Sequence, residues 1–181
     1  DIPSFLTKTN PYYQKLTPSS KALFHSRVEK FIDRKSITGR QNFLVTQEVR
    51  VTLAAAAVQL TLGLDVWDLD YFSQILIYPS EYKNPQTKLM HKGETNMGGF
   101  MCFSWKDFQL GNQTPDDKIN LGLHEFGHAI GLLHEHYSPV SGIPWNKEAV
   151  YADLKKTQGW DKAMVDVNLF QQYKVSYTNG T

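Results

Sequence analysis

A chain of 181 residues, 41% of them hydrophobic and 20% charged, fits one soluble globular domain with room for a buried core. A net charge of +1 gives no basic field for nucleic acid, and no apolar run is long enough for a membrane span. The single cysteine, Cys102, excludes an internal disulfide framework. We therefore expect one domain over residues 1–181, acting as a monomer.

The first part of the chain is predicted to be an arm followed by two helices. Residues 1–16 contain two prolines and are expected to form an extended arm that packs on the body. A helix should begin at Thr17-Pro18, a cap followed by proline in the first turn. A second helix is predicted over residues 47–62, with Thr46 as its cap and Gly63 at its end.

Two short strands are predicted next, over residues 75–78 and 98–105. If the second strand lies at the edge of a sheet, its backbone could pair with an extended peptide substrate. An interior strand with a partner on each side is an equally good interpretation. Residues 80–96 are polar and are expected to be irregular. His91 in this segment is a minor alternative as a metal ligand.

The next predicted helix, from about Pro115 to Ile130, carries the pattern H-E-x-x-H at residues 124–128. Residues four apart lie on one face of a helix, so His124 and His128 can direct their imidazoles at one metal ion. Glu125 follows the first histidine, where its carboxylate can reach a water held by that metal.

A catalytic zinc takes three protein ligands and keeps one position open, so a third ligand is required. If the helix continued, Glu135 would lie about 10 Å beyond His128 along the axis, too far for the same ion. If the helix stops at Gly131, the chain can turn and bring His134 back towards the metal. The extended pattern H-E-x-x-H-x-x-G-x-x-H is that of metzincins.

The sequence therefore predicts a zinc-dependent peptidase. His124, His128 and His134 would bind Zn2+, and Glu125 would act as general base and acid in the attack of water on a peptide bond. The rival hypothesis is a catalytically weak module of the same fold that recognises a partner protein. A third hypothesis is that this segment is an ordinary core helix whose histidines only form hydrogen bonds. Gly131 and His134 argue against it, because they extend the match to a metal-binding pattern.

The remainder of the chain is predicted to hold two helices, over residues 147–158 and 161–171. Residues 173–177 are expected to be a strand or an extended tail. Tyr173 and Tyr177 are candidates for helping zinc to stabilise the charge that develops on the substrate.

Several segments of the first two thirds of the chain match one family in combination. They are Asn10-Pro11-Tyr12-Tyr13, Val45-Thr46-Gln47-Glu48-Val49, Gln59-Leu60-Thr61-Leu62-Gly63-Leu64, Ile77-Tyr78-Pro79, Phe103-Ser104-Trp105-Lys106-Asp107-Phe108 and Asn120-Leu121-Gly122-Leu123-His124-Glu125-Phe126. Residues 10–129 thereby resemble the zinc peptidases of the Mlc titration factor A family. This resemblance implies a glutamate well downstream of the zinc helix as third ligand, on a segment that we do not find before Thr181.

A second resemblance begins at the histidine pattern. Its further segments are Gly131-Leu132-Leu133-His134-Glu135-His136, Ile143-Pro144-Trp145-Asn146-Lys147-Glu148-Ala149-Val150-Tyr151 and Gln158-Gly159-Trp160. Residues 124–173 are thus similar to bacterial astacin-like metzincins, which implies His134 as third ligand. The methionine turn of metzincins and the tyrosine ligand of astacins have no match here. A chain truncated at its C-terminus, recombined or engineered would account for this.

Both resemblances imply an α+β fold of the zincin type. In such a fold a small mixed sheet packs against helices, and the H-E-x-x-H helix lies under the active-site cleft. The titration-factor resemblance implies a cytoplasmic protein, whereas the astacin resemblance implies a secreted one. The single Cys102 favours the cytoplasm.

Overall fold

The computed structural model describes residues 1–65, 67–85, 87–113, 120–132, 134, 137–138 and 141–172. The chain divides into two compact units, Asp1–Gly131 and Leu132–Thr181, and each is described by itself. A single domain over the whole chain stays a prediction.

The N-terminal segment is helical, so the predicted extended arm is wrong. Helix α1 covers Ile2–Thr9 and helix α2 covers Pro11–Gln14. Asp1 and Asn10 cap them, each accepting a hydrogen bond from the backbone N–H three residues later. The prolines of this segment lie in first turns, where a missing N–H breaks no helical bond. The expected packing on the body is confirmed by Tyr13, which is buried.

The two long helices of the first unit begin at the predicted caps. Helix α3 covers Pro18–Arg34 and helix α4 covers Gln47–Thr61, with the hydroxyls of Thr17 and Thr46 accepting from the backbone at their starts. The two helices pack on each other. Helix α4 is buried along most of its length, and its alanines at 54–57 permit close approach of its neighbours.

A four-stranded mixed sheet forms the other layer of this unit. Its strands are β1 (Ser36–Gly39), β2 (Gln74–Tyr78), β5 (Gly93–Asn96) and β6 (Phe100–Ser104), in the order β1-β2-β6-β5. Strand β2 is parallel to β1 and β6, while β5 is antiparallel to β6. The α+β class with a small mixed sheet is therefore confirmed; its zincin character stays a prediction.

The position of β6 in this sheet decides between the two interpretations of residues 98–105 as an edge strand or an interior strand. Strand β6 has a partner on each side, so its interpretation as an edge strand is wrong and the interior alternative is right. The two edge strands are β1 and β5, and β5 lies within the segment predicted to be irregular. That segment also holds the small antiparallel pair β3 (Tyr82–Lys83) and β4 (Met90–His91).

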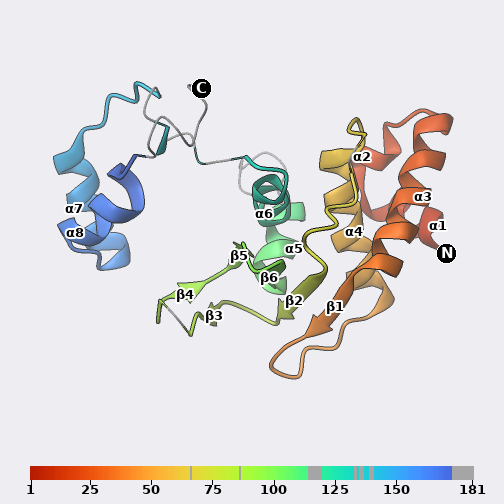
Figure 1. The fold of residues 1–181 in the computed structure, drawn as a ribbon, viewed down its shortest axis with the longest axis horizontal. Coiled ribbons are helices and arrows are strands. Elements are labelled where there is room, and N and C mark those ends of the chain that lie inside the picture. Colours follow the sequence, from red (N-terminus) through yellow and green to blue (C-terminus); the bar gives the residue numbers. More distant parts are fainter. Residues whose placement is uncertain are drawn as a thin grey trace. The chain divides into compact units, whose positions relative to one another are not determined.

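The core lies between the sheet and helices α4, α5 (Trp105–Gln113) and α6 (Leu121–Ala129), and it continues to buried residues of α1, α2 and α3 (Figure 1). Phe103, Phe108 and Phe126 are fully buried, and the ring of Phe103 packs against the rings of both Phe108 and Phe126. Because Phe126 comes from α6, this aromatic cluster fixes that helix against the sheet.

The second unit holds helix α7 (Lys147–Gln158), helix α8 (Lys162–Val165) and a π-helical turn, Asp166–Phe170. The predicted helices are thus confirmed, the second one ending as a π-helix. Gly159 has a φ of 70° and ends α7. The predicted strand at 173–177 lies outside the described residues.

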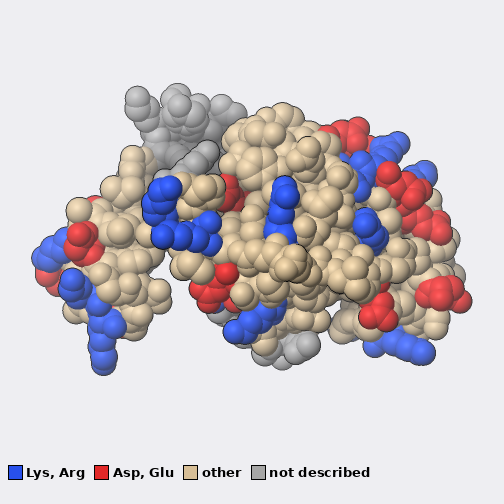
Figure 2. Space-filling view, turned by 90° about the horizontal axis from the view of Figure 1, so that it is seen from below, with Lys and Arg blue, Asp and Glu red and all other residues tan. Residues whose placement is uncertain are grey.

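Within the described part of the chain, no helix is both long and apolar enough to cross a membrane. On the face drawn in Figure 2, Lys and Arg side chains are interspersed with Asp and Glu side chains, as a net charge of +1 leads us to expect.

A substitution tests the packing of α6. A methyl group at Gly122 would lie 2.6 Å from Cε2 of Phe108, whose ring stacks on Trp105 and is fully buried. We expect Gly122→Ala to lower the free energy of unfolding by about 1–3 kcal/mol through overpacking, as measured by urea denaturation.

The matched control is Gly63→Ala, since nothing lies within 4 Å of a methyl group there. It should change the free energy of unfolding by less than about 1 kcal/mol. Equal effects of the two substitutions would contradict the close contact between α6 and Phe108.

Candidate metal centre

The helix that carries the histidine pattern is defined by its cap. Asn120 is extended, with a φ of −119°, and its side-chain oxygen accepts from the N–H of Leu123 at 2.9 Å. Its amide donates to the carbonyl of Gly111 and to the Asn112 side chain, both at 3.1 Å. Helix α6 therefore begins at Leu121, and the prediction of a continuous helix from Pro115 is wrong.

The end of α6 agrees with the sequence. The last helical residue is Ala129, Ile130 is the C-cap, and Gly131 has a φ of 92°. This left-handed conformation favours glycine and stops the helix. The predicted stop at Gly131 is confirmed. The predicted cap at Thr114 lies outside the described residues.

The two histidines of α6 meet at one point. The Nε2 atoms of His124 and His128 are 3.1 Å apart, and the imidazole centroids are 4.6 Å apart. Two nitrogens that each lie 2.0–2.1 Å from a tetrahedral zinc are separated by roughly 3.3 Å. The pair therefore fits one zinc ion as two ligands.

The same helix buries its opposite face. Gly122 and Phe126, four residues apart, are buried against the aromatic cluster, while His124 is exposed. Desolvation, and then the neighbouring His128, lower the pKa of His124 below its ordinary value. A lowered pKa favours the neutral imidazole, which is the form that binds metals.

Glu125 is buried, with 6% of its surface exposed. Its carboxylate oxygen Oε2 lies 2.9 Å from the hydroxyl of Thr95 on β5, which also lies 2.8 Å from the Glu125 carbonyl oxygen. Burial raises the pKa of Glu125, and the hydrogen bond from Thr95 partly opposes this. The group thus meets the requirement for a general base or acid, a pKa moved towards neutrality.

Strand β5 also leaves room for this carboxylate. A methyl group at Gly93 would lie 2.7 Å from Oε1 of Glu125 and 2.7 Å from Cδ1 of Leu121. A glycine at this point therefore allows the edge strand and the metal helix to enclose Glu125.

A second carboxylate on β5 is tied by neighbouring amides. Glu94 accepts from Asn84 at 2.7 Å and from Asn96 at 2.8 Å. Nδ1 of His91 lies 3.7 Å from Glu94, and Nε2 of His91 lies 3.2 Å from the Thr87 hydroxyl. His91, the minor alternative ligand, thus directs both ring nitrogens at other side chains.

His134 belongs to the second unit, where a short turn holds it. The N–H of Tyr137 donates to the His134 carbonyl at 3.0 Å, and the two rings are 5.5 Å apart. The Tyr137 hydroxyl donates to the Asn168 carbonyl at 2.5 Å. His134 is thus placed by contacts of its own unit.

Among the described residues, His124, His128 and His134 form a group whose ligand atoms could hold a metal ion. Glu135 and the candidates Tyr173 and Tyr177 lie outside the described residues.

Sequence reasoning missed the contribution of β5. Thr95 and Glu94 belong to no motif, and the polar run that contains them has no strand periodicity. The one available signal was Gly93, a glycine inside a short polar segment, which often marks close backbone approach.

The comparisons with known proteins agree on one family. A family model described as glucose-regulated metallo-peptidase M90 matches residues 2–167. Mlc titration factor A from Salmonella paratyphi B is 24% identical over 164 residues, which cover 83% of this chain and 57% of that protein. The protein of that name from Salmonella typhimurium matches equally well.

An uncharacterised protein of Synechocystis, slr2042, is 24% identical over 146 residues, covering 74% of this chain and 52% of that protein. The chain therefore spans about half the length of the curated relatives it matches.

A stability measurement tests the environment of Glu125. A carboxyl group whose pKa is raised on folding contributes stability below its unfolded pKa of about 4.5, and this contribution is lost as pH rises through the folded pKa. In metal-free protein, the free energy of unfolding of Glu125→Gln should therefore increase relative to that of the wild type as the pH is raised from 4 to 7. Urea denaturation in EDTA measures the difference.

The control is Glu81→Gln, which removes an exposed glutamate. A free energy of unfolding of Glu125→Gln that instead falls relative to that of the wild type as pH rises would contradict a raised pKa at Glu125.

Proposed function

Because this chain belongs to the glucose-regulated metallo-peptidase M90 family, we propose that it is a zinc-dependent peptidase that hydrolyses peptide bonds. In this proposal His124, His128 and His134 bind the metal, and Glu125 is the general base. The observation that carries it is the pair of Nε2 atoms 3.1 Å apart on α6, next in sequence to a buried glutamate.

Two of the proposed metal ligands lie on helix α6, and the third follows the end of that helix. The α6 histidines are one helical turn apart, and the core side of that helix is fixed by Phe126. The third ligand in the proposal is His134, supported by the stop at Gly131 and by the metzincin spacing. Zinc, when bound, would polarise the substrate carbonyl and lower the pKa of a water molecule to about 7.

Glu125 would remove a proton from the attacking water and later deliver it to the leaving amine. Its burial and raised pKa support both roles, since a carboxyl group with a pKa nearer neutrality can both accept a proton from water and release it to the amine. The Thr95 hydroxyl would hold Oε2 in place, which leaves Oε1 for the water.

The substrate would be an extended peptide that adds a strand to β5. This strand pairs with β6 on one side, and no described strand pairs with its other side. Pairing through backbone groups requires no particular side chains. Thr95 joins this strand to Glu125, so a peptide on β5 would lie next to the general base.

A binding function is the alternative. The Salmonella relatives are, by name, titration factors for Mlc. A chain that covers about half of such a relative could bind a partner protein with little hydrolysis. A variant that loses hydrolysis but still binds the partner protein would show that the two functions are separate.

The first test is the zinc content of the purified protein, measured by mass spectrometry. We expect one zinc per chain in the wild type, and binding weaker by about 100-fold or more in His124→Ala, His128→Ala and His134→Ala. His25→Ala is the control, because this α3 histidine pairs with Glu29 far from α6 in sequence. Full zinc retention in His134→Ala would remove His134 from the site.

The second test is cleavage of an unstructured protein substrate by Glu125→Gln. The glutamine keeps the size and the hydrogen bond to Thr95 but cannot accept the proton. We expect kcat/KM to fall by about 100-fold or more with zinc content unchanged. The exposed Glu81→Gln should keep wild-type activity. Unchanged hydrolysis in Glu125→Gln would exclude the proposed mechanism.

A further inference from the structure

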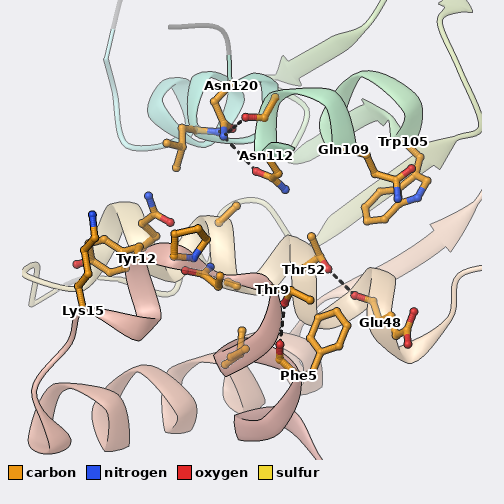
Figure 3. A pocket seen from close by; sticks show the side chains of 18 residues that line it. Phe5, Thr9, Tyr12, Lys15, Glu48, Thr52, Trp105, Gln109, Asn112 and Asn120 are labelled. Atoms are coloured by element: carbon orange, nitrogen blue, oxygen red, sulfur yellow. Dashed lines mark hydrogen bonds between the residues drawn. The ribbon is translucent and has the colours of Figure 1, made fainter. Parts of the chain in front are cut away.

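A separate hollow of about 660 Å³ lies in the first unit (Figure 3). Helices α1 and α2 form one wall, α5 and the start of α6 form the other, and α4 lies at the base. Its volume is within the range of about 300–1,000 Å³ that small-molecule sites occupy. None of the metal-site residues His124, Glu125 and His128 lines it.

The base of this hollow is apolar because α4 presents small side chains to it. Ala55 and Ala56 are buried and contribute only methyl groups. Phe5 and Trp105 line the two walls. The hollow can therefore take an apolar side chain of a ligand.

Neutral hydrogen-bonding groups surround this base. Gln59 from α4 and Gln109 from α5 both line the hollow. In the described part of the chain, neither side-chain amide is hydrogen-bonded to another residue. Each amide offers a donor and an acceptor, as a peptide group does.

The charged residues of the lining are Lys15 and Glu48, one of each sign. Figure 3 shows them at opposite ends of the hollow. Neither forms an ion pair with a described residue. An ammonium and a carboxylate at opposite ends are complementary to a ligand with a carboxylate at one end and an ammonium at the other.

We propose that this hollow binds a short peptide with free termini, its ammonium at Glu48 and its carboxylate at Lys15. Gln59 and Gln109 bond the peptide groups, and an apolar side chain lies over Ala55 and Ala56. A single amino acid carries its ammonium and carboxylate groups on the same carbon atom, so these two groups lie close together. A peptide gains up to about 3.5 Å of reach per residue. The site does not depend on peptidase activity.

The test uses isothermal titration calorimetry with the tripeptide Ala-Leu-Ala and the full chain carrying Glu125→Gln, so that the peptide is not consumed. Acetylation of the peptide N-terminus, or amidation of its C-terminus, should each raise Kd by about five-fold, which is the size of an exposed ion pair, since Lys15 and Glu48 are both exposed. In a Glu48→Gln background, acetylation should no longer matter. In a Lys15→Gln background, amidation should no longer matter.

The controls are Glu81→Gln and Lys30→Gln, which remove exposed charges outside the hollow and should leave Kd unchanged. Circular dichroism checks that each variant is folded. Three results would overturn the proposal: no binding of the free tripeptide at millimolar concentration, equal binding of the blocked peptides, or unchanged Kd in both pocket variants. The last would place the peptide elsewhere on the chain, including the proposed metal site.

Discussion

The Glu125 carboxylate is buried between α6 and the edge strand β5, and this burial sets the requirements for both elements. The helix must lie close enough for Thr95 to reach Oε2, and the strand must carry a glycine opposite Oε1. The aromatic cluster around Phe126 supplies the force that holds the helix there, since fully buried rings strongly resist displacement. The proposed chemistry thus rests on packing that lies on the other side of the helix from the histidines.

Much of this arrangement could be predicted because its signals are local. Thr17 and Thr46 mark helix starts, and Gly131 marks a stop, since each acts through its own backbone neighbours. The spacing of His124 and His128 fixes their common face through helical geometry alone. These features needed no knowledge of the rest of the chain.

The remainder depends on contacts between distant segments. Strand β5 has no alternation of apolar and polar residues, because its role is to meet α6 and not to cover the core. Asp1 and Asn10 act as caps by the same chemistry as Thr17, yet the prolines beside them were interpreted as signs of an extended arm. The late start of helix α6, at Leu121, follows from Asn120, whose side-chain amide donates hydrogen bonds to Gly111 and Asn112 of α5.

The side of β5 that pairs with no described strand also bears on aggregation of the chain. A strand edge that accepts one peptide backbone can accept the edge of another copy of the chain and so nucleate a shared sheet. β5 spans only Gly93–Asn96, and the charged side chain of Glu94 is fixed on it by Asn84 and Asn96. A short edge with a fixed charge gives a second copy few backbone bonds to gain, so it favours transient occupancy over sheet growth.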